Sequence, residues 1–97
     1  MKLTPLTAGT ISGTGTVTLE GQFGNAGTIG GVLITADGTN NATVTLRKDT
    51  ATGTILFDIV TKSPIFVSGP FRSDSTKTIY YTISGTGASA MLYEWHD

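Results

Sequence analysis

Short runs in which apolar and polar residues alternate, separated by turns rich in glycine, aspartate and asparagine, fill almost the whole of this 97-residue chain. Val44 and Leu46 alternate with threonines, and Ile79, Tyr81 and Ile83 follow the same period of two. Successive side chains of a strand point to opposite faces, so this period indicates strands with one buried face. Threonine and glycine suit a half-buried sheet and its tight turns. We therefore expect an all-β fold, a single antiparallel β-sandwich of about seven short strands, immunoglobulin-like or jelly-roll-like.

The turns predict how the strands are joined. Most links have about 3 to 6 residues, so neighbouring strands are expected to pair as hairpins. Residues 37–41 begin with Asp-Gly, a strong hairpin signal. Residues 54–61 carry apolar side chains on both faces, which predicts a central strand. Gly30 and Gly31 interrupt another strand and indicate a bulge or a close backbone approach.

The hexapeptide Thr-Ile-Ser-Gly-Thr-Gly occurs twice, at residues 10–15 and 82–87. A composition so rich in these residues favours such a recurrence, and Ser-Gly-Thr-Gly is a good turn sequence. The alternative is that both copies form equivalent corners of two similar hairpins. The matched segment is too short to indicate a duplicated unit.

The length allows one domain, because a second hydrophobic core would not fit. We divide the chain into an extended N-terminal arm, residues 1–13, and a β-sandwich domain, residues 14–97. Leu3, Leu6 and Ile11 make the arm mildly apolar, so it can add a strand to the open edge of a neighbouring subunit. A frayed tail and an edge strand of the protein's own sheet are the alternatives.

The sequence offers no set of residues with catalytic spacing. The one histidine, His96, lies beside the C-terminal end, where chains commonly fray. The serines have no histidine and aspartate at a recognisable spacing, and the acidic residues are scattered, mostly in turns. Residues 37–41 lack the spaced acids of a calcium loop, and no Gly-Lys-Ser/Thr phosphate loop is present. We expect no enzymatic activity, no catalytic residue, no metal site and no cofactor.

Charge and cysteine content exclude further classes. The net charge is −1, the pI is near 5.6 and no basic cluster occurs, so nucleic acid is not an expected partner. Cysteine is absent, so no disulfide framework exists. The first residues contain no signal peptide, and no apolar run approaches the roughly 18 residues of a membrane span. We expect synthesis in the cytoplasm without an encoded export signal, and no membrane partner.

Aromatic residues are the best candidates for a contact surface. In the last predicted strand Met91, Tyr93 and Trp95 share one face, so either they or the alternating set points away from the core. Exposed Tyr, Trp and Met are typical of protein interfaces and of platforms that stack on sugars. Packing in the core is the alternative for each one. The predicted contact residues, with those of the arm, are Leu3, Leu6, Ile11, Tyr80, Tyr93 and Trp95.

Three segments together resemble small, threonine- and glycine-rich β-sandwich proteins of tailed bacteriophage virions: TADGTNNATVTLRKD (residues 35–49), ILFDIVTKSP (55–64) and IYYTISGTGA (79–88). The resemblance is one of pattern, covers about two thirds of the chain and carries over no functional residue. It implies a non-enzymatic structural protein, in the first place a capsid decoration or cement protein. A tail, collar or fibre component is the alternative.

The resemblance also implies partners and a location. Proteins of this kind are usually homo-oligomers, trimers being common, and they bind the major capsid protein or another virion protein. The expected location is the virion, after synthesis in the host cytoplasm.

A carbohydrate-binding module is the alternative from another class. Tyr80, Tyr93 and Trp95 would then stack on sugar rings. Such modules often carry Ca²⁺ and more exposed tryptophan, and they commonly accompany an enzyme or a signal peptide. The sequence shows none of these features, so a glycan is an expected ligand only under this alternative.

Overall fold

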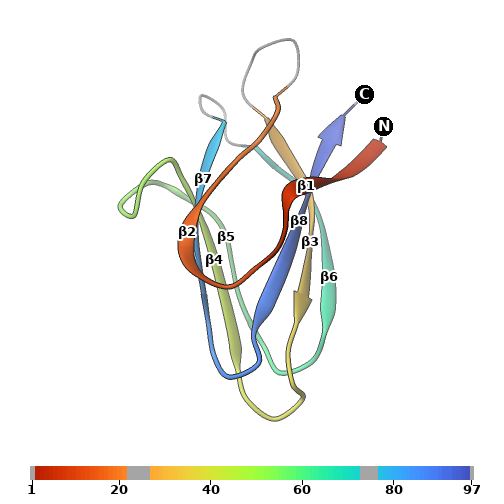
Figure 1. Cartoon of the computed structure of the whole chain (residues 1–97), viewed down its shortest axis with the longest axis vertical. Coiled ribbons are helices and arrows are strands. Elements are labelled where there is room, and N and C mark those ends of the chain that lie inside the picture. The colour runs from red at the N-terminus through yellow and green to blue at the C-terminus, as the bar shows by residue number, and fades with distance from the viewer. Residues whose placement is uncertain (1, 22–26, 73–76, 97) are drawn as a thin grey trace.

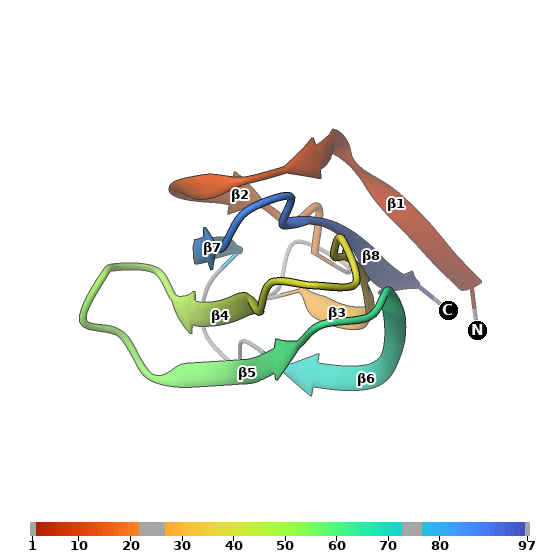
Figure 2. The same cartoon turned by 90° about the horizontal axis from the view of Figure 1, so that it is seen from below.

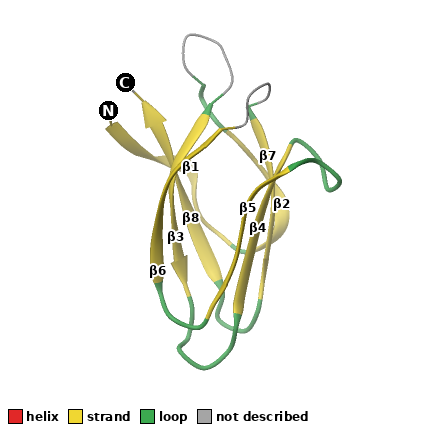
Figure 3. Cartoon of the chain, turned by 180° about the vertical axis from the view of Figure 1, so that it is seen from behind, coloured by secondary structure: helices red, strands yellow, loops and turns green. Residues whose placement is uncertain are grey.

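The computed structural model describes residues 2–21, 27–72 and 77–96, which form eight strands and no helix (Figures 1 and 3). The all-β expectation is confirmed, and one strand more than the expected seven is present because part of the predicted arm is a strand. The strands are β1 (Lys2–Ile11), β2 (Gly13–Thr18), β3 (Thr28–Thr35), β4 (Ala42–Lys48), β5 (Ile55–Thr61), β6 (Ile65–Arg72), β7 (Thr78–Ser84) and β8 (Ser89–His96).

The strands form two antiparallel four-stranded sheets that pack against each other (Figure 2). Sheet A has the order β1-β8-β3-β6 and sheet B the order β2-β7-β4-β5. Among the described strands, β4 and β5 are the one consecutive pair that lies side by side, and every other link passes between the sheets. The expectation that sequence neighbours pair as hairpins is therefore wrong elsewhere. A link of a few residues spans the roughly 10 Å between packed sheets as readily as it closes a hairpin.

The link that begins with Asp37-Gly38 is a clear case of this difference. It joins β3 of sheet A to β4 of sheet B, so it is an arch between sheets and not the predicted hairpin. The Asp37 carboxylate accepts hydrogen bonds from the backbone N–H of Thr39 and Asn40, at 2.8 and 2.7 Å. The side-chain amide of Asn40 donates a further one at 2.7 Å. Aspartate thus organises this change of direction locally, without strand pairing.

The inward faces of both sheets meet in one hydrophobic core. Of the alternating residues named from the sequence, Val44, Leu46, Ile79 and Ile83 are buried and Tyr81 is half-buried against the core, which confirms the period-of-two argument. Burying each such aliphatic side chain contributes about 1.5–3 kcal/mol relative to leaving it in water. Val17, Leu19, Val32 and Ile34 are buried in the same core.

The first and last strands of the chain pair with each other. β1 pairs with β8, placing Lys2 opposite His96, and β2 pairs with β7, placing Thr18 opposite Thr78. These four strands form one long antiparallel ribbon that bends from sheet A into sheet B. Most of the predicted arm is thus an edge strand of the protein's own sheet, the second alternative weighed above.

Both copies of the repeated hexapeptide lie on this ribbon where it passes between the sheets. Gly13 of the first copy is opposite Ile83 of the second, and Thr14 is opposite Thr82. Gly13 and Gly85, which are equivalent positions, both have a positive φ, 72° and 117°. Glycine adopts this conformation without steric cost, so it suits both bends. Neither copy is the corner of a hairpin.

Strand β5 lies at the edge of sheet B, so the prediction of a central strand is wrong. Phe57 of β5 is buried and its ring meets that of Phe71 of β6 edge to face, with centroids 5.0 Å apart. The two rings close the core between the sheets at this edge. Ile55 and Val60 remain exposed, although their apolar character suggested burial.

Candidate functional site

The outer face of sheet A carries a continuous set of apolar side chains. Ala90, Leu92 and Glu94 of β8 point into the protein. Because side chains alternate along a strand, Met91, Tyr93 and Trp95 point outward. Cross-strand register places Leu3 opposite Trp95, and Leu33 opposite both Met91 and Phe66. We call this set the aromatic face, and it consists of Leu3, Leu33, Phe66, Met91, Tyr93 and Trp95.

Two glycines form the floor of the aromatic face. The β-bulge that the Gly30-Gly31 pair predicts is confirmed, because the register of β3 shifts between Ile29 and Gly31 against both neighbouring strands. A side chain at Gly31 would collide with the ring of Phe66, and one at Gly30 would collide with Leu3 and come within 3.0 Å of Trp95 Cβ. The absence of two side chains therefore lets large ones lie flat across β3.

The large side chains pack on one another and remain accessible. The ring of Phe66 meets that of Tyr93 edge to face, at a centroid distance of 5.8 Å. Phe66 is 43% exposed, Leu3 39% and Leu33 38%. Trp95 is half-buried, and its Nε1 is buried without a hydrogen-bond partner among the described residues. The exposed part of the Trp95 side chain is therefore carbon, so this face offers apolar and aromatic contact.

The structure brings some of the predicted contact residues together and separates others. Leu3, Tyr93 and Trp95 lie on the aromatic face. Tyr80 is on β7, half-buried, on the outer face of sheet B on the other side of the molecule. Leu6 and Ile11 point into the core and are not exposed in this chain.

Sequence reasoning missed two members of the aromatic face. Leu33 is part of the unbroken apolar run Val32-Leu33-Ile34, in which alternation alone does not show which residue points outward. Phe66 stands in a similar run, Ile65-Phe66-Val67. The glycine pair was the available signal, since glycine in a strand marks a place where something lies close above it.

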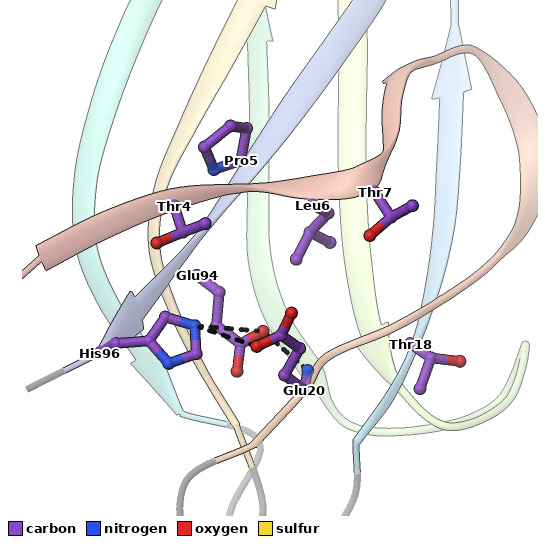
Figure 4. Close-up of a pocket in the computed structure, with 8 residues that line it drawn as sticks. All are labelled: Thr4, Pro5, Leu6, Thr7, Thr18, Glu20, Glu94 and His96. Carbon is purple, nitrogen blue, oxygen red and sulfur yellow. Dashed lines mark hydrogen bonds and ion pairs between the residues drawn. The ribbon is translucent and has the colours of Figure 1, made fainter.

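A small polar pocket lies where β1, β2 and β8 meet (Figure 4). Its volume is about 20 Å³, room for a water molecule and far below the roughly 300 Å³ or more of a typical ligand site. Glu94, 2% exposed, accepts hydrogen bonds from the backbone N–H of Glu20 and Gly21, both at 2.8 Å. These charge-assisted bonds tie the end of the β2 segment to β8.

His96 is also at this pocket. Its Nε2 lies 3.8 Å from Glu94 Oε1 and 4.0 Å from Glu20 Oε2 (Figure 4). Within residues 2–21, 27–72 and 77–96, no group of three His, Asp or Glu side chains has an arrangement that would hold a metal ion. The Glu94 carboxylate holds the backbone of Glu20 and Gly21 in place, and the pocket has no room for a substrate.

The Asp37 turn is the other organised polar feature. Hydrogen bonds from the backbone N–H and then the side chain of Asn40, followed by the N–H of Thr39, lower the pKa of the Asp37 carboxyl below its ordinary value of 3.8. Both carboxylate oxygens accept hydrogen bonds within the turn. The turn is exposed and self-contained, and it lies apart from the aromatic face.

Comparison with known proteins gives no relative: no protein-family model, no curated protein and no solved structure matches this chain. The part of the chain that the structure describes contains no helix long and apolar enough to cross a membrane. The candidate functional site is therefore defined by its geometry, and that site is the aromatic face.

Proposed function

We propose that this chain is a non-enzymatic structural protein of a bacteriophage virion, a capsid decoration or cement protein that acts through protein–protein contacts. A tail, collar or fibre component of the same particle is the second assignment. The observation that carries the proposal is the aromatic face. Contiguous accessible aromatic and aliphatic side chains on a small domain are typical of a surface that another protein covers.

The strand order supports a jelly-roll assignment over an immunoglobulin-like one. The sheets have four strands each, in the orders β1-β8-β3-β6 and β2-β7-β4-β5, and nearly every link changes sheet. Immunoglobulin sandwiches of the constant type have seven strands, whereas jelly rolls have eight in two Greek keys and recur in viral capsid proteins and lectins. The assignment agrees with the virion proposal.

The physical basis of the role is repetition. One aromatic face buries a modest area, and a single contact of that kind holds weakly. A shell presents many identical binding positions with fixed geometry, so subunits that also contact one another gain avidity without further contacts. We accordingly propose self-association as well as binding to the major capsid or another virion protein.

The test is the protein composition of purified virions of the virus that encodes the chain. We expect the chain in many copies per particle, and we expect Tyr93→Ser to reduce its incorporation strongly. Tyr80→Ser is the matched control, because it removes the same half-buried residue type from the opposite outer face. Particles without the chain, or equal incorporation of both variants, would contradict the proposal.

A carbohydrate-binding module is the second candidate function, since Tyr93 and Trp95 share one accessible face. A glycan array with Trp95 fluorescence as a second readout separates the two. Saturable sugar binding that is lost in Tyr93→Ser would favour the module. Unchanged fluorescence with every glycan supports the structural role.

A further inference from the structure

Strand β1 lies at the edge of sheet A, and its pairing with β8 is interrupted (Figure 2). The register covers Lys2 to Pro5 and then only Thr10 and Ile11, so residues 6–9 have no partner in it. Of the ten residues of β1, Leu6 and Ile11 are the buried ones. Detaching β1 therefore withdraws two side chains from the core and breaks two short stretches of pairing.

The link between β1 and β2 is the single residue Ser12, which is exposed. Gly13 follows with a φ of 72°, and nothing lies within 4 Å of the position that its Cβ atom would take. Packing therefore does not require glycine at this position. The positive φ requires it, because this backbone conformation bends the ribbon from sheet A into sheet B. Glycine adopts a negative φ as readily, so the same link can straighten and carry β1 away from its own sandwich.

We propose that two copies of this chain exchange β1, so that β1 of each copy pairs with β8 of the other in the register that the single chain shows. The structure thus specifies the occupant of the vacated edge of β8 residue by residue, from Lys2 opposite His96 to Ile11 opposite Ala90. Exchange of an identical element is a low-cost route to a dimer, because the same contacts form in both states. The inference goes beyond the virion role and does not depend on it.

The order of the strands favours capture of β1 by a second copy. β1 is the first strand and β8 the last, so their pairing closes the longest loop of any strand pair in the two sheets. The entropic cost of closing a loop grows with its length, and the effective concentration of the two ends falls. In an unfolded chain, β1 therefore meets its own β8 less often than any other strand meets its partner. At high protein concentration, β8 of another copy competes best at this pairing.

The short link also determines where the two sandwiches meet. The two residue steps from Ile11 to Gly13 span at most about 7 Å, so both links lie close to the two-fold axis of the dimer. This corner of the ribbon is accessible, because residues 12–14 are exposed. β2 stays paired with β7 of its own chain, and the Glu94 carboxylate still binds the backbone of its own chain. β1 is the one strand that changes its partner.

Introduced cysteines show which chain supplies β1, because the chain has none of its own. Leu3→Cys and Trp95→Cys are prepared as separate variants, mixed in urea, refolded together at high concentration and mildly oxidised. The two positions lie opposite each other across β1 and β8, so we expect a disulfide-linked dimer that contains one chain of each variant. Thr16→Cys and Tyr80→Cys, opposite each other across β2 and β7, are the matched control and should give far less. Equal yields from the two mixtures, or no mixed dimer of Leu3→Cys with Trp95→Cys, would overturn the proposal.

A substitution in the link tests the cause of the exchange. Gly13→Val penalises the positive φ of the closed form in both chains, so we expect it to raise the association constant of the dimer by about 30-fold or more. Light scattering behind size exclusion measures the change from 10.1 kDa to twice that mass. Gly38→Val is the control, because Gly38 also has a positive φ, 88°, with nothing within 4 Å of its Cβ position, but it joins β3 to β4.

Circular dichroism shows whether both glycine variants are folded. A folded Gly13→Val that stays monomeric, or equal dimerisation of Gly13→Val and Gly38→Val, would contradict the exchange. If Gly13→Val does not fold, the mixture of cysteine variants decides alone, since it leaves the link unchanged.

Discussion

The ring of Phe66 occupies the space that a side chain at Gly31 would need. We expect Gly31→Ala to force the ring away, to break its contact with Tyr93, and to lower the free energy of unfolding by about 1–3 kcal/mol, the usual cost of overpacking. Chemical denaturation measures this loss. In a Phe66→Ala background the same substitution should cost much less, and an equal cost in both backgrounds would show that the ring is not the obstacle.

Glu94 is the one charged residue among the described residues that is buried. Glu94→Gln keeps the shape of the side chain but turns its amide NH₂ toward the backbone N–H of Glu20 or Gly21, so that one donor loses its acceptor. We expect the free energy of unfolding to fall by about 1–3 kcal/mol. Hydrogen exchange at the amides of Glu20 and Gly21 should accelerate as well. Glu20→Gln is the control, since the Glu20 side chain is 76% exposed, and we expect its effect on the free energy of unfolding to stay within about 0.5 kcal/mol. Equal effects of the two substitutions would contradict the tie that we assign to Glu94.

Asp37 gives the stability of the chain a defined pH dependence. Its folded-state pKa is lowered below 3.8 by the hydrogen bonds from Asn40 and Thr39. Its contribution is therefore complete above about pH 3.8 and is lost as the pH falls from there through the folded-state pKa. A carboxyl NMR titration should give a midpoint below 3.8, and the stability difference between wild type and Asp37→Ala should shrink over that acidic range. A midpoint above 3.8 would contradict the bonding described for the turn.

At the scale of the element, β1 is part of the folded sheet. Leu6 is buried in the core, whereas Leu3, on the same strand, is exposed. We expect Leu6→Ala to lower the free energy of unfolding by about 2–5 kcal/mol, and Leu3→Ala to lower it by less than about 1 kcal/mol. Urea denaturation of both variants checks this. Two small and equal effects would mean that the segment behaves as a detached arm.

Individual strands could be predicted from the sequence because burial of one face leaves a period of two. The period of two does not identify the buried face where apolar residues follow one another, as in Val32-Leu33-Ile34 and in β5. In β5 a register shift opposite Leu46-Arg47 lets Leu56 as well as Phe57 contact the core, while Ile55 turns out to solvent. A pattern of this kind does not tell a central strand from an edge strand.

At the scale of the whole molecule, the arrangement of strands in sheets could not be predicted. Links of similar length join β4 to β5 within a sheet and β3 to β4 between sheets, so link length does not separate the two cases. For the candidate site, alternation identified Tyr93 and Trp95 as one face, and the arm residues suggested Leu3. The contributions of Leu33 and Phe66 depend on which strands become neighbours, and this follows only from the complete fold.

In the bent ribbon β1 pairs with β8 and β2 pairs with β7, and this pairing affects how the chain can fold while it is made on the ribosome. The first two strands made are the partners of the last two, so sheet B is complete only after Ser84 has emerged and sheet A only after His96 has emerged. Until β7 is made β4 lacks one of its two neighbours, and until β8 is made β3 lacks one of its two. We expect arrested chains ending before β8 to remain protease-sensitive, and full-length chains to refold on the slow, millisecond-to-second scale of folds built from distant pairings.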